Sequence, residues 1–173
     1  MLVTKTNYLD QLTHLREEIN IVDDEIIKTL VEMQRRIKKR SAGSKSDNGI
    51  VQYILEKITG AGNGLRDEFI FEVIETVVKN LSVEINCISF FDISPEVRKL
   101  LELIKERMEF SIAVGEIKKD QGLSVFNKER ENFVKSRWML EAAKKSLDTF
   151  FFHDIIEVIL RESRLLQLEI KEK

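Results

Sequence analysis

The chain has 173 residues, enough for one or two small domains, and its 43% hydrophobic and 34% charged residues are ordinary for a globular protein. A formal net charge of −2 excludes the general attraction to nucleic acids or membrane surfaces that a strongly basic chain would show, and the single cysteine, Cys87, excludes an intrachain disulfide and a cysteine-based metal cluster. The first ten residues carry no apolar signal core and no stretch approaches transmembrane length, so we expect a cytoplasmic protein. One proline and seven glycines favour long helices over a turn-rich β fold.

Three helices are expected in the first half of the chain. Apolar residues at steps of three and four, from Leu12 to Ile37, predict a long helix over about residues 9–39. A helix of this length is not stable alone, so its apolar stripe must pack on other helices. A short helix over roughly residues 50–58 and a third helix over 65–85 follow, separated by breaks rich in glycine.

The same order of helices is expected again in the second half. Ser94-Pro95-Glu96 is a strong helix start, because it supplies a capping side chain, a proline for the first turn and an acid at the positive end of the helix dipole. Helices are predicted over about residues 97–120, 128–145 and 146–173, with Asn127 as the N-cap of the second. Because the order long, short, long occurs twice, the simplest interpretation is an internal duplication of roughly 85 residues.

Polar residues interrupt the apolar rows of the two long helices in the second half. Arg107 and Lys118 share a row with aliphatic residues, and Ser163 and Gln167 continue the row of Phe152 in the last helix. Polar groups on core-facing rows need partners, because burying one without a hydrogen bond costs about 1–3 kcal/mol. A polar pocket inside a helical bundle explains the pattern. The alternative interpretation is that these polar residues lie at the edge of an apolar stripe, where long side chains reach water.

The ordered set of these residues resembles the active-site signature of the all-helical (AroQ-class) chorismate mutases. The matching stretches read ERMEFSIAVGEIKKDQGLSVFNKEREN, residues 106–132, and ILRESRLLQ, residues 159–167. Each element alone is weak, but the spacing of the whole set is specific. The resemblance implies an all-α fold of six helices, arranged as two intertwined three-helix units that form a pseudo-dimer within one chain. Residues 7–88 would be a degenerate half, and residues 94–173 would carry most of the active site.

The two halves differ in which family residues they keep. The segment LREEINIVDDEII resembles the start of the family's first helix and places Arg16 at the position of an arginine that, in the family's homodimers, reaches into the partner's site. The second half has Phe90 at that position. The first half has lost the other site residues, and the replacements are Met33, Ser44, Leu81 and Ile85. The resemblance therefore implies one active site per chain, completed by Arg16. The alternative for Arg16 is a surface residue paired with Asp10, Asn20 or Asp23.

The resemblance also implies a role for each site residue. Arg16, Arg107 and Arg130 would hold the two carboxylates of the substrate, with support from Ser163. Lys118 and Gln167 would donate hydrogen bonds to its ether oxygen, and Glu131 would accept one from its ring hydroxyl. The family often has Asp at the position of Asn127, where a helix N-cap is the role that the sequence favours. The eight predicted site residues are Arg16, Arg107, Lys118, Asn127, Arg130, Glu131, Ser163 and Gln167.

The activity implied is the rearrangement of chorismate to prephenate in the biosynthesis of phenylalanine and tyrosine. No cofactor or metal is implied, and the expected partner is the small molecule chorismate rather than a nucleic acid or a membrane; further oligomerisation stays open. Two alternatives remain: an isochorismate-pyruvate lyase of the same fold, and a non-catalytic helical homologue that acts through a partner. Glu131 and Ser163 argue against the lyases, which tend to lack that pair.

Overall fold

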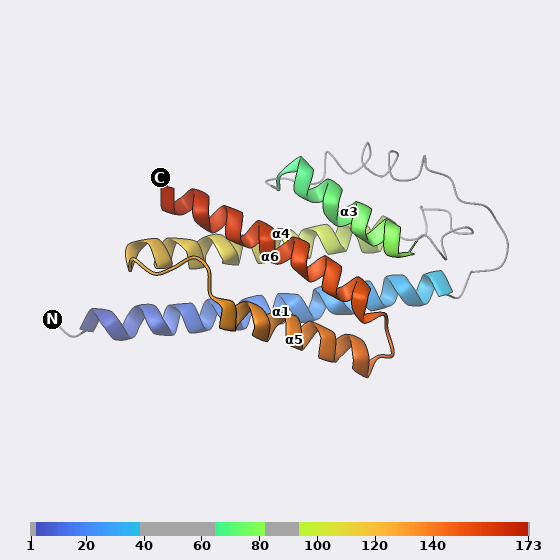
Figure 1. Ribbon diagram of the computed structural model, residues 1–173, viewed down its shortest axis with the longest axis horizontal. Coiled ribbons are helices and arrows are strands. Elements are labelled where there is room, and N and C mark those ends of the chain that lie inside the picture. The colour runs from blue at the N-terminus through green and yellow to red at the C-terminus, as the bar shows by residue number, and fades with distance from the viewer. Residues whose placement is uncertain (1–2, 39–64, 82–93, 173) are drawn as a thin grey trace.

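The computed structural model describes residues 3–38, 65–81 and 94–172, and all the regular structure within them is helical, as the sequence predicts (Figure 1). The helices are α1 (Val3–Lys38), α3 (Asp67–Leu81), α4 (Ser94–Asp120), α5 (Lys128–Lys144) and α6 (Thr149–Glu172). The short helix expected over residues 50–58 lies outside the described residues, as do Ser44, Ile85, Cys87 and Phe90. Five of the six expected helices are therefore present.

The helix α1 begins earlier than its apolar periodicity predicts. It starts at Val3 rather than near residue 9. No glycine or proline interrupts residues 3–8, and Tyr8 packs against a small apolar cluster formed by Leu12, Ile19 and Val114. The first turns thus have a tertiary contact that stabilises them in addition to their own hydrogen bonds.

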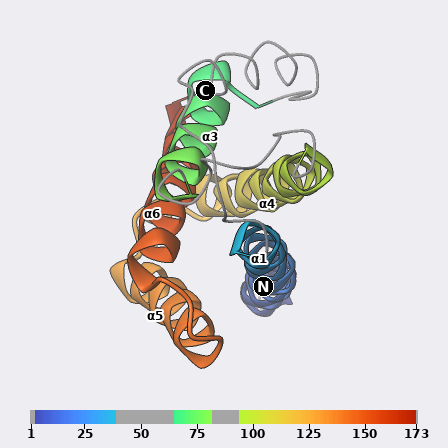
Figure 2. The ribbon, with the colours of Figure 1, turned by 90° about the vertical axis from the view of Figure 1, so that its right-hand side faces the viewer.

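The two long helices α1 and α4 lie side by side and run in opposite directions, as Figure 1 shows, and Figure 2 shows α4 next to α1, which is seen nearly end-on. Their apolar stripes are buried: Leu12 is 4% exposed and Leu100 is 1% exposed. Ion pairs across this interface include Arg107 with Asp23 at 2.7 Å and Arg36 with Glu96 at 2.9 Å. The packing of the stripes that begin at Leu12 and Leu100, expected from the sequence, is confirmed.

The helix α6 crosses α4 and is the scaffold for α3 and α5. It packs on α4, on α3 and on α5, and Phe151 and Phe152 of α6 are fully buried in the main apolar core. Trp138 of α5 meets Phe152 edge to face, with the ring centroids 6.4 Å apart. Burying a large apolar side chain contributes about 1.5–3 kcal/mol, so this core fixes α5 and α6 against the long pair.

None of the helices that the structure describes has a run long and apolar enough to cross a lipid bilayer.

Candidate functional site

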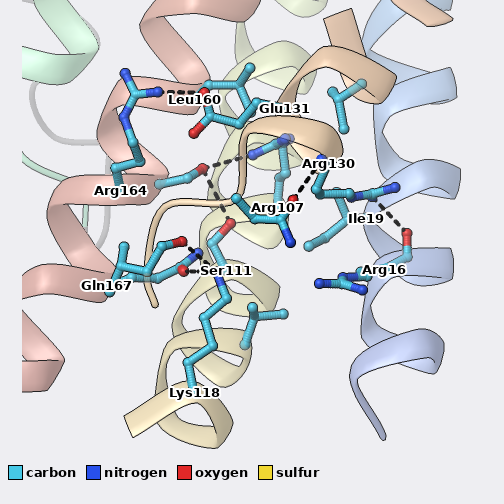
Figure 3. Close-up of a pocket in the computed structure, with 15 residues that line it drawn as sticks. Arg16, Ile19, Arg107, Ser111, Lys118, Arg130, Glu131, Leu160, Arg164 and Gln167 are labelled. Carbon is cyan, nitrogen blue, oxygen red and sulfur yellow. Dashed lines mark hydrogen bonds and ion pairs between the residues drawn. The ribbon is translucent and has the colours of Figure 1, made fainter. Parts of the chain in front are cut away.

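A cavity opens where α1, α4, α5 and α6 converge (Figure 3). Its empty volume is about 560 Å³, a figure that includes space open to solvent. Apolar side chains of Ile19, Val114, Val125, Val134 and Leu160 form part of its wall. The structure brings all eight side chains singled out in the sequence to this wall, and they are Arg16, Arg107, Lys118, Asn127, Arg130, Glu131, Ser163 and Gln167.

The α4 side of the cavity is a row of polar residues at steps of four and seven. Arg107, Ser111 and Lys118 fall on one face because such steps return to nearly the same helical angle. All three are buried, and Arg107 is only 2% exposed. Its Nη1 donates a hydrogen bond to Ser163 Oγ at 2.8 Å, and Ser111 Oγ lies 3.2 Å from the same oxygen. The predicted row is thus the lining of a polar pocket, not a stripe edge from which these side chains reach water.

Lys118 is held by two acceptors from different parts of the chain. Its Nζ donates to the Val125 carbonyl at 2.6 Å and to Gln167 Oε1 at 2.9 Å. Burial lowers the pKa of Lys118 to about 8, and the nearby charge of Arg16 acts in the same direction, while Glu131 partly opposes them. The ammonium group is therefore mostly protonated at neutral pH.

Gln167 reaches the cavity because α6 approaches α4 closely at Gly115. A Cβ atom added at Gly115 would lie 3.0 Å from Gln167 Cγ and 3.3 Å from Gln167 Cα, tighter than ordinary van der Waals contact. Since the Gln167 oxygen accepts from Lys118, its amide nitrogen is the end left to donate to a ligand. A glycine at position 115 thus sets the depth at which Gln167 enters the site.

The start of α5 supplies the roof of the cavity. Asn127 is the N-cap of α5, and its side chain accepts from the Arg130 amide at 2.8 Å, which confirms the capping prediction. The Arg130 guanidinium donates to the Arg16 carbonyl at 3.2 Å and to Asn20 Oδ1 at 2.9 Å, which ties α5 to α1. Burial, followed by the charge of Arg16, lowers the pKa of Arg130 to about 10. Arg130 is therefore a half-buried cation with other cations close to it.

Arg16 projects from α1 into the same space as Arg107 and Lys118 (Figure 3). The alternative of a surface arginine paired with Asp10, Asn20 or Asp23 has no support among the contacts of the described residues, because Asn20 binds Arg130 and Asp23 binds Arg107. Arg16 is half-buried, and its charge acts on both Lys118 and Arg130. Those interactions place its guanidinium close to the other cations of the cavity.

Two contacts of the site were not anticipated from the sequence. Glu131 Oε2 accepts from Arg164 Nη1 at 2.5 Å, and Arg164 also lines the cavity. Asp23, which is 0% exposed, accepts from Arg107 Nε at 2.7 Å. A signal for Asp23 was present, since it stands four residues after Ile19 and four before Ile27 on a buried row of α1. Arg164 had no comparable signal because a half-exposed arginine beside Ser163 is unremarkable.

The electrostatic character of the cavity follows from its lining. Five cationic side chains, from Arg16, Arg107, Lys118, Arg130 and Arg164, face a single lining carboxylate, Glu131. Such a pocket favours a ligand with two negative charges even though the whole chain carries a net charge of −2. Across the described ranges 3–38, 65–81 and 94–172, no three His, Cys, Asp or Glu side chains gather as ligands for a metal ion.

Residues 98–168, which span nearly all of α4, all of α5 and most of α6, match the family described as chorismate mutase type II. No curated protein and no solved structure gives a significant match to the chain.

Proposed function

We propose that the chain is a chorismate mutase, an isomerase that rearranges chorismate to prephenate, and the match of residues 98–168 to the chorismate mutase type II family supports this proposal. The observation that carries the proposal is the arrangement of the cavity. Seven family site residues from the second half and Arg16 from the first half line one pocket, with an excess of positive charge. Chorismate is a dianion, and a guanidinium is a planar fork that matches the geometry of a carboxylate.

The reaction needs no covalent intermediate, so the protein has to hold the substrate compact and stabilise the charge that develops on it. In the rearrangement an ether C–O bond breaks while a C–C bond forms. Lys118 Nζ and the amide nitrogen of Gln167 come from neighbouring positions, since Nζ lies 2.9 Å from Gln167 Oε1. In our proposal these two groups donate to the ether oxygen as negative charge builds on it. Glu131, fixed by Arg164, accepts from the ring hydroxyl.

The arrangement of the chain is part of the proposal. We infer that residues 7–88 and 94–173 are two diverged copies of one three-helix unit that form an internal pseudo-dimer. The antiparallel packing of α1 and α4 supports this inference, and so does the position of Arg16 on the wall of a cavity otherwise built by the second half. The two halves would then share one site in aromatic amino acid biosynthesis.

An assay of the purified chain with chorismate and with isochorismate tests the proposed activity. We expect prephenate to form from chorismate. Release of pyruvate from isochorismate, with no prephenate from chorismate, would instead identify a lyase. A folded chain that converts neither compound would be a non-catalytic homologue, and the proposal would be wrong.

Binding stoichiometry tests the single-site arrangement. A transition-state analogue of the rearrangement should bind with one site per chain, because Met33 stands at the first-half position that corresponds to Arg107 and is fully buried in the apolar core. Isothermal titration calorimetry measures the ratio directly. Two equivalent sites per chain would contradict the loss of the first-half pocket.

The substitution Gln167→Glu should shift activity to acid pH. An amide donates a hydrogen bond at any ordinary pH, whereas a carboxyl group donates only when it is protonated, and an ionised Glu at position 167 would accept from Lys118 instead. We expect kcat at pH 7 to fall about 100-fold and to recover as the pH is lowered toward the carboxyl pKa of about 4. Gln121→Glu, at an exposed loop position, is the matched control. An unchanged pH–rate profile for Gln167→Glu would exclude Gln167 as the donor.

A further inference from the structure

The carboxylate of Asp23 is buried in α1 against the guanidinium of Arg107. Asp23 Oδ1 accepts from Arg107 Nε at 2.7 Å, and the two side chains are 0% and 2% exposed. Asp23 lies outside the segment matched to the family, and it does not itself line the cavity. Its connection to the site runs through Arg107.

The contact fixes how Arg107 is presented to the cavity. Arg107 Nε is bound to Asp23, and Nη1 is bound to Ser163 Oγ at 2.8 Å, so the planar guanidinium is held at two of its three nitrogen atoms. Within the part of the chain that the structure describes, Arg107 Nη2 donates no hydrogen bond. The two contacts thus fix the plane of the Arg107 guanidinium. They leave the edge that includes Nη2 to bind an anion in the cavity.

Packing of α1 on α4 does not require a buried ion pair at this level. Replacing such a pair by apolar residues is often neutral or stabilising, because taking two charges out of water is costly. The chain itself contains the comparison. In the register that sets Met33 equivalent to Arg107, Val97 is equivalent to Asp23, and both Met33 and Val97 are buried in the main apolar core.

Met33 and Val97 are the apolar counterpart of Arg107 and Asp23, and they lie at the corresponding place in the α1–α4 interface. The ion pair between Arg36 and Glu96, at 2.9 Å, sets this section of α1 against the start of α4, and Val97 follows Glu96 directly. The counterpart pair, Met33 from the first half and Val97 from the second, is therefore apolar at both positions. The pair beside the cavity, Asp23 from the first half and Arg107 from the second, has kept both charges. This contrast points to a role for the pair in the site and not in the fold.

We propose that Asp23 is a positioning residue of the active site, which holds Arg107 at the angle needed to grip a carboxylate of the substrate. The inference rests on the proposed function and extends it, since the first half would contribute Asp23 as well as Arg16. The charge of Asp23 has a second effect that fits this role. Burial and Arg16 lower the pKa of Arg130, and the Asp23 carboxylate opposes them, so it helps to keep the neighbouring cation charged.

The test is Asp23→Asn, which keeps the shape of the side chain and removes its charge. We expect kcat/KM for chorismate to fall roughly 10- to 100-fold, because a misplaced binding group costs that much. The melting temperature should change by only a few degrees. Asp24→Asn is the matched control: Asp24 is the next residue, it is exposed, and its ion pair with Arg137 lies outside the cavity lining. It should keep the wild-type rate.

A double-mutant cycle separates positioning from a general structural effect. If Asp23 acts through Arg107, Asp23→Asn should cause no further loss of kcat/KM in an Arg107→Met background. An equal loss in both backgrounds would overturn the inference, and so would a fully active Asp23→Asn single variant beside an active wild type. If Arg107→Met does not fold, the single variant and its control decide the question. A wild-type chain that converts neither chorismate nor isochorismate would overturn the proposed function, and this inference with it.

Discussion

Lys118→Met should reduce kcat/KM by roughly 1,000-fold, the largest loss expected for any single substitution in this chain. The lysine ammonium is the charged donor to the ether oxygen in the proposed reaction, and methionine fills the same stem volume without donating. Steady-state kinetics on chorismate measures the effect. Lys119→Met, an exposed lysine on the same helix, is the matched control and should keep the wild-type rate. A Lys118→Met variant within a small factor of the wild type would remove Lys118 from the mechanism.

The pH dependence of the wild type gives the same residue an independent test. Because the pKa of Lys118 in the folded protein is about 8, below its ordinary value of 10.5, kcat/KM should decline as the pH rises above about 8. The stability of the protein should change with pH in the opposite direction to its activity. The unfolded chain binds the proton more tightly, so the free energy of unfolding should rise between pH 8 and 10.5 on account of this group. That increment should be absent in Lys118→Met, which denaturant titrations of both proteins across this range would show.

Arg16→Ala should lower kcat/KM by about 100-fold with little change in melting temperature, because a half-buried arginine at a pocket wall adds little to the core. The contact from Arg130 to the main chain of α1 uses the Arg16 carbonyl and survives the substitution. Arg35→Ala, at an exposed position of the same helix, is the control. Full activity in Arg16→Ala would refute a site shared between the two halves.

Mixing two inactive variants shows which chain supplies Arg16. If α1 and α4 of one chain form the site, a mixture of Arg16→Ala and Lys118→Met proteins stays inactive after joint unfolding and refolding. If two chains exchange α1, some sites regain both residues and activity partly returns. We expect no recovery, because the covalent connection gives the chain's own α1 a high effective concentration.

The helices were predictable because their determinants are local. Steps of three and four between apolar residues, the Ser94-Pro95 start and the Asn127 cap each act over a few residues of sequence, and the long helices formed where those signals place them. The start of α1 at Val3 escaped prediction because it depends on a tertiary contact of Tyr8 with the cluster around Leu12. The apolar periodicity that begins near residue 9 does not depend on that contact and so could not predict it.

The features of the site also divide into those that the sequence could predict and those that it could not. Side chains that repeat a known spacing, such as Arg107 and Lys118, could be identified without a structure. The acceptor for Lys118 at Val125 could not, because a backbone carbonyl is present at every position and only the path of the loop after α4 selects it. The pairing of Asp23 with Arg107 also escaped prediction. It joins residues 84 positions apart, and the register between α1 and α4 had to be known first.

That same separation of 84 positions has a consequence during synthesis. α1 emerges from the ribosome first, with an apolar stripe and a carboxylate that both await α4. At about 5–20 residues per second, several seconds pass before Arg107 is made. A single helix in water is only marginally stable, so α1 spends that interval largely unfolded and open to chaperones or to the α4 of a neighbouring chain. Synthesis of many chains close together would thus favour exchange of α1 between chains, and synthesis of isolated chains would favour pairing of α1 with the α4 of the same chain.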